Sequence, residues 1–341
     1  MTMGQLGGVD CRASLAMTNN RDVGNIKLSG CCVPPTRNGI GPSCVGLPPG
    51  NWATVLDFLV ERFPAIAREV WRQRMTNGDV LDELGIAVGP RSAYRSHVRL
   101  YYYREVVNEP RIPFDEVVLF EDEHLIVVDK PHFLPVVPSG NYLAETVLVR
   151  LKRKLGLHTL VPIHRIDRDT AGLVLFSKQP ETRAVYHALF SQHSVEKTYE
   201  AVAPRRDDLK LPLTRASRIV EAGHFMLQHE VSGTPNAVTH IALLEVRGQL
   251  ARYQLQPVTG KRHQLRVHMA ALGLPILNDG LYPALTPQGQ IDYAQPLQLL
   301  ARQIEFVDPV TGQPREFNSQ RRLHCLAELG SDPRKDLHEP I

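Results

Sequence analysis

Residues 164–176 of this chain read HRIDRDTAGLVLF, and the fold and chemistry that we expect follow from this stretch. A His-Arg pair and two Asp residues precede a Thr-Ala-Gly turn and an apolar, strand-like run. Asp167 should therefore lie beside Arg on a fixed loop at the edge of a sheet, where it stays ionised near neutral pH. Such a carboxylate can act as a nucleophile or a base without a metal. These residues alone leave open a surface turn in which Asp pairs with Arg for structure.

A second polar block occupies residues 259–279, which read TGKRHQLRVHMAALGLPILND. Its Gly turn should lead into a short helix on which Arg262 and Arg266 share one face, as do Gln264 and His268. Donors to phosphate or carboxylate groups are thereby concentrated within a short segment. A basic helix that is merely solvated does not require this density of His and Gln beside Arg.

Both blocks resemble motifs of the RluA-type RNA pseudouridine synthases. The first is similar to His-Arg-Leu-Asp-x-x-Thr-Ser-Gly-Leu, and the second to Thr-Gly-Arg-x-His-Gln-Ile-Arg-x-His followed by Gly-x-Pro-Ile-x-Gly-Asp. Residues 197–199 resemble the family's Lys-x-Tyr strand, and residues 119–131 resemble its opening pattern that ends in Lys-Pro. The resemblance covers residues 117–317, with the motifs in the family's order.

The resemblance implies isomerisation of a uridine in RNA to pseudouridine. The glycosidic bond breaks, the uracil rotates and its C5 bonds to the ribose, so no cofactor is needed. By the same resemblance Asp167 is the catalytic residue, Arg266 pairs with it, and Tyr199 packs against the uracil and is a candidate to help remove the C5 proton. Attack on the ribose and removal of a ribose proton both remain open for Asp167.

RNA is therefore the expected partner, either ribosomal or transfer RNA. The target base must leave its stack to reach the carboxylate, and Arg165 is placed to fill the vacated space or to hold a phosphate. We expect RNA contacts from six residues: Arg165, Lys261, Arg262, His263, Gln264 and His268. Two departures from the family pattern are Lys261, which keeps the charge but not the fork of Arg, and Asn278, which replaces Gly and predicts a left-handed Asn.

Composition adds weaker constraints. The 341 residues are 43% apolar and 22% charged with a net charge of +3, which fits a globular protein and permits nucleic-acid binding. No apolar run has the length of a membrane span and no secretory signal is visible, so we expect a cytoplasmic protein, with a monomer as the default. Four of the five cysteines lie in the first fifty residues, but their irregular spacing argues against zinc and we expect no metal.

The many short strands and few long helices predict an α+β fold with a mixed, mainly antiparallel sheet flanked by helices, the pseudouridine synthase fold. We place a disordered leader at 1–51, a small module at 52–107, the catalytic domain at 108–329 and a disordered tail at 330–341. The small module has helical periodicity at 54–63 and 65–75 and a strand pattern at 98–103. It resembles an S4-type RNA-binding module, and a helical cap with solvated arginines is the alternative.

Two other functions compete with isomerisation. One is a catalytically silent RNA-binding protein on the same fold, which would not need Asp167, Tyr199 and Arg266 together. The other is a hydrolase that uses Asp167 with His164 or His263. Hydrolysis needs a water-activating base and an oxyanion site, and the chain lacks the Gly-x-Ser-x-Gly nucleophile elbow.

Overall fold

The computed structural model describes residues 33–106, 108–224, 226–286 and 291–326. The chain divides into two compact units, Met1–Asn108 and Glu109–Ile341, and each is described by itself. Residues 1–32 of the predicted leader and the predicted tail at 330–341 lie outside the described residues. In the described ranges, no helix has the length and apolarity needed to cross a membrane.

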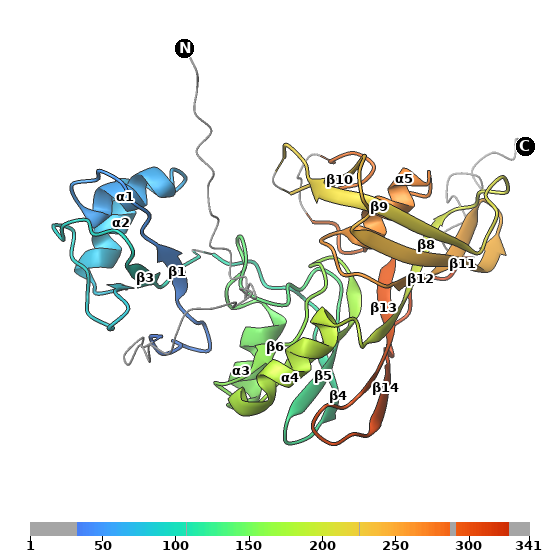
Figure 1. Ribbon diagram of the computed structural model, residues 1–341, viewed down its shortest axis with the longest axis horizontal. Helices are drawn as coiled ribbons and strands as arrows, with labels where there is room; N and C mark the ends of the chain where they lie inside the picture. The colour runs from blue at the N-terminus through green and yellow to red at the C-terminus, as the bar shows by residue number, and fades with distance from the viewer. Residues whose placement is uncertain (1–32, 107, 225, 287–290, 327–341) are drawn as a thin grey trace, which may run out of the picture. The chain divides into compact units, whose positions relative to one another are not determined.

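In the part of the first unit that the structure describes, two helices accompany a small antiparallel sheet in the order β1-β3-β2; α1, α2, β1 and β3 are labelled in Figure 1. Thr54 begins the first helix with a capping box: its hydroxyl accepts from the backbone N–H of Asp57, and the Asp57 carboxylate accepts from the backbone N–H of Thr54. Such a box satisfies donors that the first turn leaves unpaired. The elements are β1 (Ser43–Gly46), α1 (Val55–Arg62), α2 (Arg68–Thr76), β2 (Val80–Leu81) and β3 (Arg99–Tyr102).

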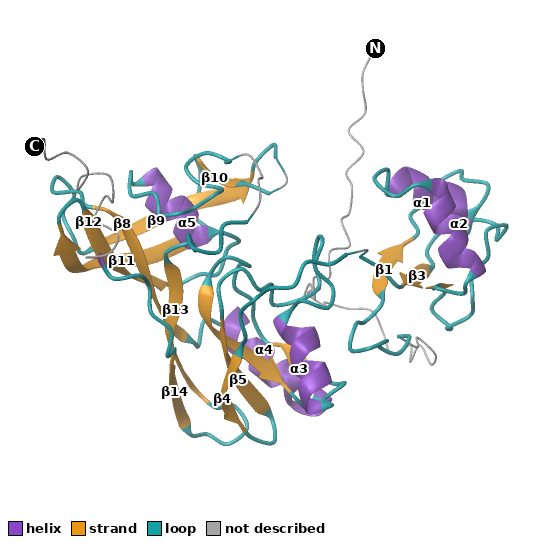
Figure 2. Cartoon of the chain, turned by 180° about the vertical axis from the view of Figure 1, so that it is seen from behind, coloured by secondary structure: helices purple, strands orange, loops and turns teal. Residues whose placement is uncertain are grey.

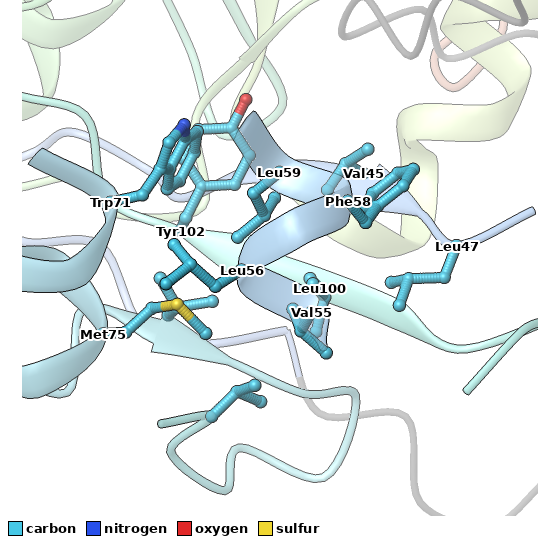
Figure 3. Close-up of a cluster of buried hydrophobic side chains, with 12 residues drawn as sticks. Val45, Leu47, Val55, Leu56, Phe58, Leu59, Trp71, Met75, Leu100 and Tyr102 are labelled. Carbon is cyan, nitrogen blue, oxygen red and sulfur yellow. The ribbon is translucent and has the colours of Figure 1, made fainter. Parts of the chain in front are cut away.

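One hydrophobic cluster forms the core of this unit, and Figure 3 shows its side chains pointing toward one another from α1, α2, β1 and β3. Trp71 and Leu59 are completely buried, and each such side chain contributes on the order of 2 kcal/mol through burial. The cluster corrects the predicted leader boundary, because Val45 and Leu47 are buried in it and β1 pairs with β3. The strand was missed because its four residues, Ser-Cys-Val-Gly, carry little apolar alternation.

The helices and the strand that we predicted in this unit are confirmed as α1, α2 and β3. Arg68 and Arg72 of α2 both have acidic partners, since Arg68 bonds to Asp57 at 2.7 Å and Arg72 lies 3.6 Å from Glu69. The S4-like character of the module stays a prediction.

The described part of the second unit is built on an 11-stranded sheet in the order β10-β9-β11-β12-β8-β13-β7-β5-β4, with β14 on β13 and β6 on β7 (Figures 1 and 2). The mainly antiparallel α+β fold that we predicted is therefore confirmed. The strands are β4 (Val117–Glu121), β5 (Leu125–Lys130), β6 (Val161–Pro162), β7 (Ala171–Ser177), β8 (Glu196–Pro204), β9 (Leu213–Glu221), β10 (Gln228–Val231), β11 (Ala237–Arg247), β12 (Leu250–Pro257), β13 (Leu299–Val307) and β14 (Pro314–Asn318).

Among the described residues, three helices accompany this sheet: α3 (Val147–Leu155), α4 (Pro180–Ser191) and α5 (Gln264–Ala271). Alternate residues of β5 join different clusters: Ile126 and Val128 pack in the cluster that includes α3, whereas Leu125 and Val127 pack in the cluster that includes Tyr186 of α4. Because strand side chains alternate between faces, this explains why every residue of β5 is buried.

Strands β7 and β13 are parallel and join the two antiparallel parts of the sheet. Gly172 makes this pairing possible. Its φ is +110°, and a Cβ at this position would lie 2.2 Å from the carbonyl oxygen of Ala301. The Thr-Ala-Gly segment of the first block thus brings β7 against β13 and fixes the loop that precedes β7, which carries Asp167.

Candidate active site

The loop between β6 and β7 is held in place by side chains at the end of β5 and just after it. Nζ of Lys130 donates to the carbonyl oxygen of Arg168 at 2.8 Å, and Nδ1 of His132 lies 2.7 Å from the carbonyl oxygen of Asp169. The backbone N–H of Thr170 closes the turn by donating to the carbonyl oxygen of Asp167 at 3.2 Å. These bonds fix the backbone from Asp167 to Thr170.

Lys130 is completely buried and donates to two further carbonyl oxygens, those of Pro131 and Leu134. Burial lowers the pKa of this ammonium to about 7, against the opposing charges of Asp169 and Asp167. The three carbonyl acceptors match the three N–H donors of an ammonium group. The Lys-Pro sequence after β5 therefore ties the end of that strand to the Asp167 loop.

Arg266 on α5 connects two carboxylates. Its Nη1 donates to Oδ2 of Asp167 at 3.1 Å, while Nε and Nη2 donate to the two oxygens of Asp279 at 2.8 and 2.6 Å. The fork of bonds to Asp279 fixes the plane of the guanidinium group, and only 2% of Arg266 is exposed. Asp279 thereby orients Arg266, and Arg266 orients Asp167, as the sequence predicted for that pair.

The Asp167 carboxylate is ionised in this environment. Burial by itself raises its pKa, but the electrostatic interactions with His263 and Arg266 and the hydrogen bond from Arg266 outweigh that effect and lower the pKa below the ordinary value for Asp. Burial also lowers the pKa of His263, despite the nearby Asp167, so near pH 7 the permanent charge comes from Arg266. With 28% of its side chain exposed, Asp167 is held on one side and accessible on another.

Tyr199 lies on β8, partly buried, close enough to Asp167 for its titration to respond to that charge. Burial, reinforced by Asp167, raises the pKa of Tyr199 far above its ordinary value. The phenol therefore remains protonated at neutral pH. This favours packing against a base over removal of a proton.

Two of the predicted RNA contacts are wrong. Gln264 and His268 are 4% and 0% exposed, and both bond to Thr239 of β11, from Gln264 Nε2 and His268 Nδ1 at 2.9 Å each. His268 Nε2 also lies 3.0 Å from the hydroxyl of Ser217. Their polar atoms are satisfied inside the protein, because this face of the short helix packs on the sheet.

The other residues that we predicted to contact RNA are less buried than Gln264 and His268. Arg165 and Lys261 are exposed, and Arg262 donates to the carbonyl oxygen of Met226 at 3.2 Å. Arg262 does not share a helical face with Arg266, because α5 begins only after His263, whose φ is +55°. Asn278 has φ +62°, which confirms the left-handed turn that we predicted there.

His164 does not face the Asp167 carboxylate as a base. Its Nε2 accepts from the backbone N–H of Leu175 at 3.2 Å, and its ring stacks on Phe190 with centroids 4.5 Å apart. Burial lowers its pKa to about 3, with the charges of Lys197 and His187 adding to the effect. A nitrogen whose lone pair is already used in this way is unsuited to activating water, which removes support from the hydrolase alternative.

Sequence reasoning missed the roles of Lys130, His132, Asp279 and Tyr282. The Lys-Pro pair and the Asp that ends the second block were visible signals, but their partners lie far away in the chain. Tyr282 follows that Asp by three residues, and its ring lies 5.4 Å from the Arg266 guanidinium carbon. In the described ranges, no group of three or more His, Cys, Asp or Glu side chains could hold a metal ion.

Comparisons with known proteins identify a family model and relatives that are similar to this chain. Residues 124–271 match the RNA pseudouridylate synthase family model. The chain is 30% identical over 238 residues to an uncharacterised RNA pseudouridine synthase of Synechocystis, covering 67% of this chain and 79% of the relative. It is also 30% identical over 222 residues to the dual-specificity RNA pseudouridine synthase RluA of Haemophilus influenzae, covering 62% and 96%.

A solved structure supports the fold. The human RNA pseudouridylate synthase domain containing 1 aligns with a TM-score of 0.51 at 18% identity, covering 65% of this chain and 95% of that one. The family match contains the first polar block and most of the second, and so includes Asp167 and Arg266. The chain belongs to the RluA-type family of RNA pseudouridine synthases.

Proposed function

We propose that this enzyme isomerises specific uridines of structured ribosomal or transfer RNA, with Asp167 as the catalytic residue. The observation that carries the proposal is the ionised, partly exposed Asp167 carboxylate, which Arg266 holds from the protein side at 3.1 Å. A silent RNA-binding protein would have no use for a buried arginine fixed between two carboxylates. Burying a charged guanidinium group costs several kcal/mol unless carboxylates pair with its charge.

The reaction exchanges one bond to the ribose for another. The bond between uracil N1 and ribose C1′ breaks, and a bond between uracil C5 and C1′ forms. The C5 hydrogen leaves as a proton and N1 acquires one, so the product is an isomer of the substrate. Asp167 either attacks the ribose or takes a ribose proton, and Arg266 keeps it ionised and oriented for both roles. Tyr199, which stays protonated, packs against the uracil.

The uridine has to leave its stack to reach Asp167, at a cost on the order of a few kcal/mol. Arg165, exposed two residues before Asp167, is suited to fill the vacated space or to hold a neighbouring phosphate. Exposed Lys261 and partly exposed Arg262 lie on the segment before α5 and supply further donors toward RNA.

The first unit is proposed to add affinity for RNA. Residues 85–104 contain four arginines and one histidine but no Asp or Glu, and Arg91, Arg95 and Arg99 are exposed. Exposed arginines in an acid-free segment suit contact with phosphates.

We propose the cytoplasm as the location of the protein and a monomer as its oligomeric state.

Release of tritium from RNA labelled at uracil C5 tests the reaction directly. Wild-type enzyme is expected to release tritium from ribosomal or transfer RNA. Asp167→Asn should lower the rate by at least about 10³-fold, the scale found when a catalytic group is removed. Asp169→Asn is the matched control on the same loop. It should cost no more than about fivefold, because an exposed ion pair contributes about 1 kcal/mol or less.

Each outcome of this assay has a separate meaning. Equal loss in both variants would show that loop charge, not Asp167 itself, carries the activity. RNA binding without tritium release by the wild type would support the silent binder, and release of free uracil would support hydrolysis. Arg165→Ala belongs in the same series: full activity on structured RNA would refute its role in base flipping.

A further inference from the structure

His263 is the second side chain that faces Asp167. It occupies the left-handed position immediately before α5, and 9% of its side chain is exposed. Its Nε2 lies 3.8 Å from Oδ1 of Asp167, whereas Arg266 bonds to Oδ2. Its Nδ1 lies 2.9 Å from the hydroxyl oxygen of Tyr282. The imidazole thus connects Asp167 to a tyrosine outside the catalytic set.

The hydrogen bonds around Tyr282 favour one of the two neutral tautomers of His263. The Tyr282 oxygen accepts from the backbone N–H of Gln228 at 2.8 Å. Its own O–H is then available to donate to Nδ1 of His263, the one other polar partner of this hydroxyl among the described residues. A neutral imidazole has one donor and one acceptor nitrogen. If Nδ1 accepts, the proton resides on Nε2, the nitrogen that faces Asp167.

We propose that Tyr282 is a positioning residue that acts through His263: its hydroxyl fixes the Nε2–H tautomer and so presents an N–H donor to the second oxygen of Asp167. This inference rests on the proposed catalytic role of Asp167. Arg266 and His263 then hold the carboxylate from two sides, one with a permanent charge and the other with a neutral dipole. The distance of 3.8 Å between His263 Nε2 and Asp167 Oδ1 exceeds a hydrogen bond, and closure is expected when RNA is bound, since catalytic contacts often tighten in the substrate complex.

A neutral ring is essential to this arrangement. Burial lowers the pKa of His263, and the charges of Arg266 and Arg262 act in the same direction, while Asp167 and Asp279 oppose them. The groups around the ring are Asp167 from the loop before β7, Arg262 and Arg266 from its own segment and helix, and Asp279 and Tyr282 from the segment after α5. Protonation would place an imidazolium against Asp167 and weaken it as a nucleophile or base.

Tyr282→Phe removes the hydroxyl and keeps the aromatic ring beside Arg266. Nδ1 then loses the donor that favours the neutral ring, so the pKa of His263 should rise. We expect the acidic limb of the kcat–pH profile to move upward by about 0.5–1 pH unit, with KM for RNA within about twofold. Tyr253→Phe is the matched control, because this buried tyrosine donates to the carbonyl oxygen of Pro204 at 2.8 Å. Its profile should coincide with that of wild type.

Nitrogen NMR of the full chain labelled at histidine supplies a readout independent of activity. The His263 signals, identified by their loss in His263→Gln, should show the Nε2–H tautomer in wild type and a mixture of tautomers in Tyr282→Phe. An Nδ1–H tautomer in wild type would overturn the proposal even if Asp167→Asn abolishes activity. The proposed function and this inference can therefore fail separately.

A double-mutant comparison tests whether the effect runs through His263. Glutamine at 263 keeps an N–H donor but cannot titrate. Adding Tyr282→Phe to His263→Gln should therefore produce no further shift of the acidic limb, as expected when two residues act as one unit. The proposal is wrong if the same shift persists in the double variant, or if Tyr282→Phe alone behaves like Tyr253→Phe.

Discussion

At the scale of single residues, the site depends on a fork that one arginine makes between two carboxylates. Arg266 uses two donors on Asp279 and a third on Asp167. Asp279 also accepts from the backbone N–H groups of Leu281 and Tyr282, so it is held before Arg266 engages it. The planar guanidinium group of Arg has five donors and can bond to Asp279 and Asp167 at once, whereas the ammonium group of Lys lacks this fork geometry.

Arg266→Lys should therefore lower kcat by about 10²-fold, comparable to the loss of one preorganised donor in an active site. KM for RNA should change little, because Arg266 is buried. The measurement is steady-state tritium release with the folded fraction determined in parallel. Arg150→Lys is the matched control: Arg150 makes a similar fork to Glu145 and Glu116 away from the site, and the variant should lose stability but not kcat. Equal kcat losses in the two variants would contradict the special role of Arg266.

At the scale of elements, the parallel pairing of β7 with β13 determines where the Asp167 loop lies. Leu300 and Ala301 pair with Ala171 and Gly172, immediately after the loop that carries Asp167. The polar strands β9 and β14 expose alternate residues and were not among the elements predicted from the sequence, whereas the apolar run that forms β7 was. An element that is buried on both faces is recognisable by its composition, but an edge or half-exposed strand depends on its neighbours.

Gly172→Ala should destabilise the second unit by at least about 2 kcal/mol, through a backbone clash combined with strain at a positive φ. Gly248→Ala provides the comparison, because Gly248 also has a positive φ of +57° but a Cβ there meets nothing within 4 Å. That variant should lose about 1 kcal/mol. Thermal or denaturant unfolding measures both. Similar losses of stability in the two variants would indicate that the close approach of β13 to Gly172 does not cause the destabilisation.

At the scale of the whole molecule, two units with separate cores are joined in one chain. Arg68 and Arg72 lie four residues apart on α2, but both are near acidic partners. The acid-free segment at 85–104 offers exposed arginines instead. We therefore expect the exposed arginines of residues 85–104 to contribute more to RNA binding than Arg68 and Arg72 do.

Arg91→Glu with Arg95→Glu should weaken RNA binding and flatten the dependence of log Kd on log salt by about 0.7–0.9 for each phosphate that the protein no longer neutralises. The kcat at saturating RNA should be retained, since the substitutions lie outside the catalytic unit. Arg68→Glu with Arg72→Glu changes the net charge by the same amount and should have a smaller effect on the slope. If both pairs act alike, net charge rather than a specific surface governs binding.

The sequence by itself determined the α+β class and the helices of the first unit, and its resemblance to known motifs implied the family and the pairing of Asp167 with Arg266. Those features follow from local periodicity and from motifs in which neighbouring residues carry the signal. Tertiary structure alone decided that Gln264 and His268 are buried, that Asp279 orients Arg266 and that Tyr282 reaches His263. Periodicity indicates which side of an element faces inward, but not which group it meets. Arg266 and Asp167 are 99 residues apart, and only the sheet that joins β7 to β13 brings their surroundings together.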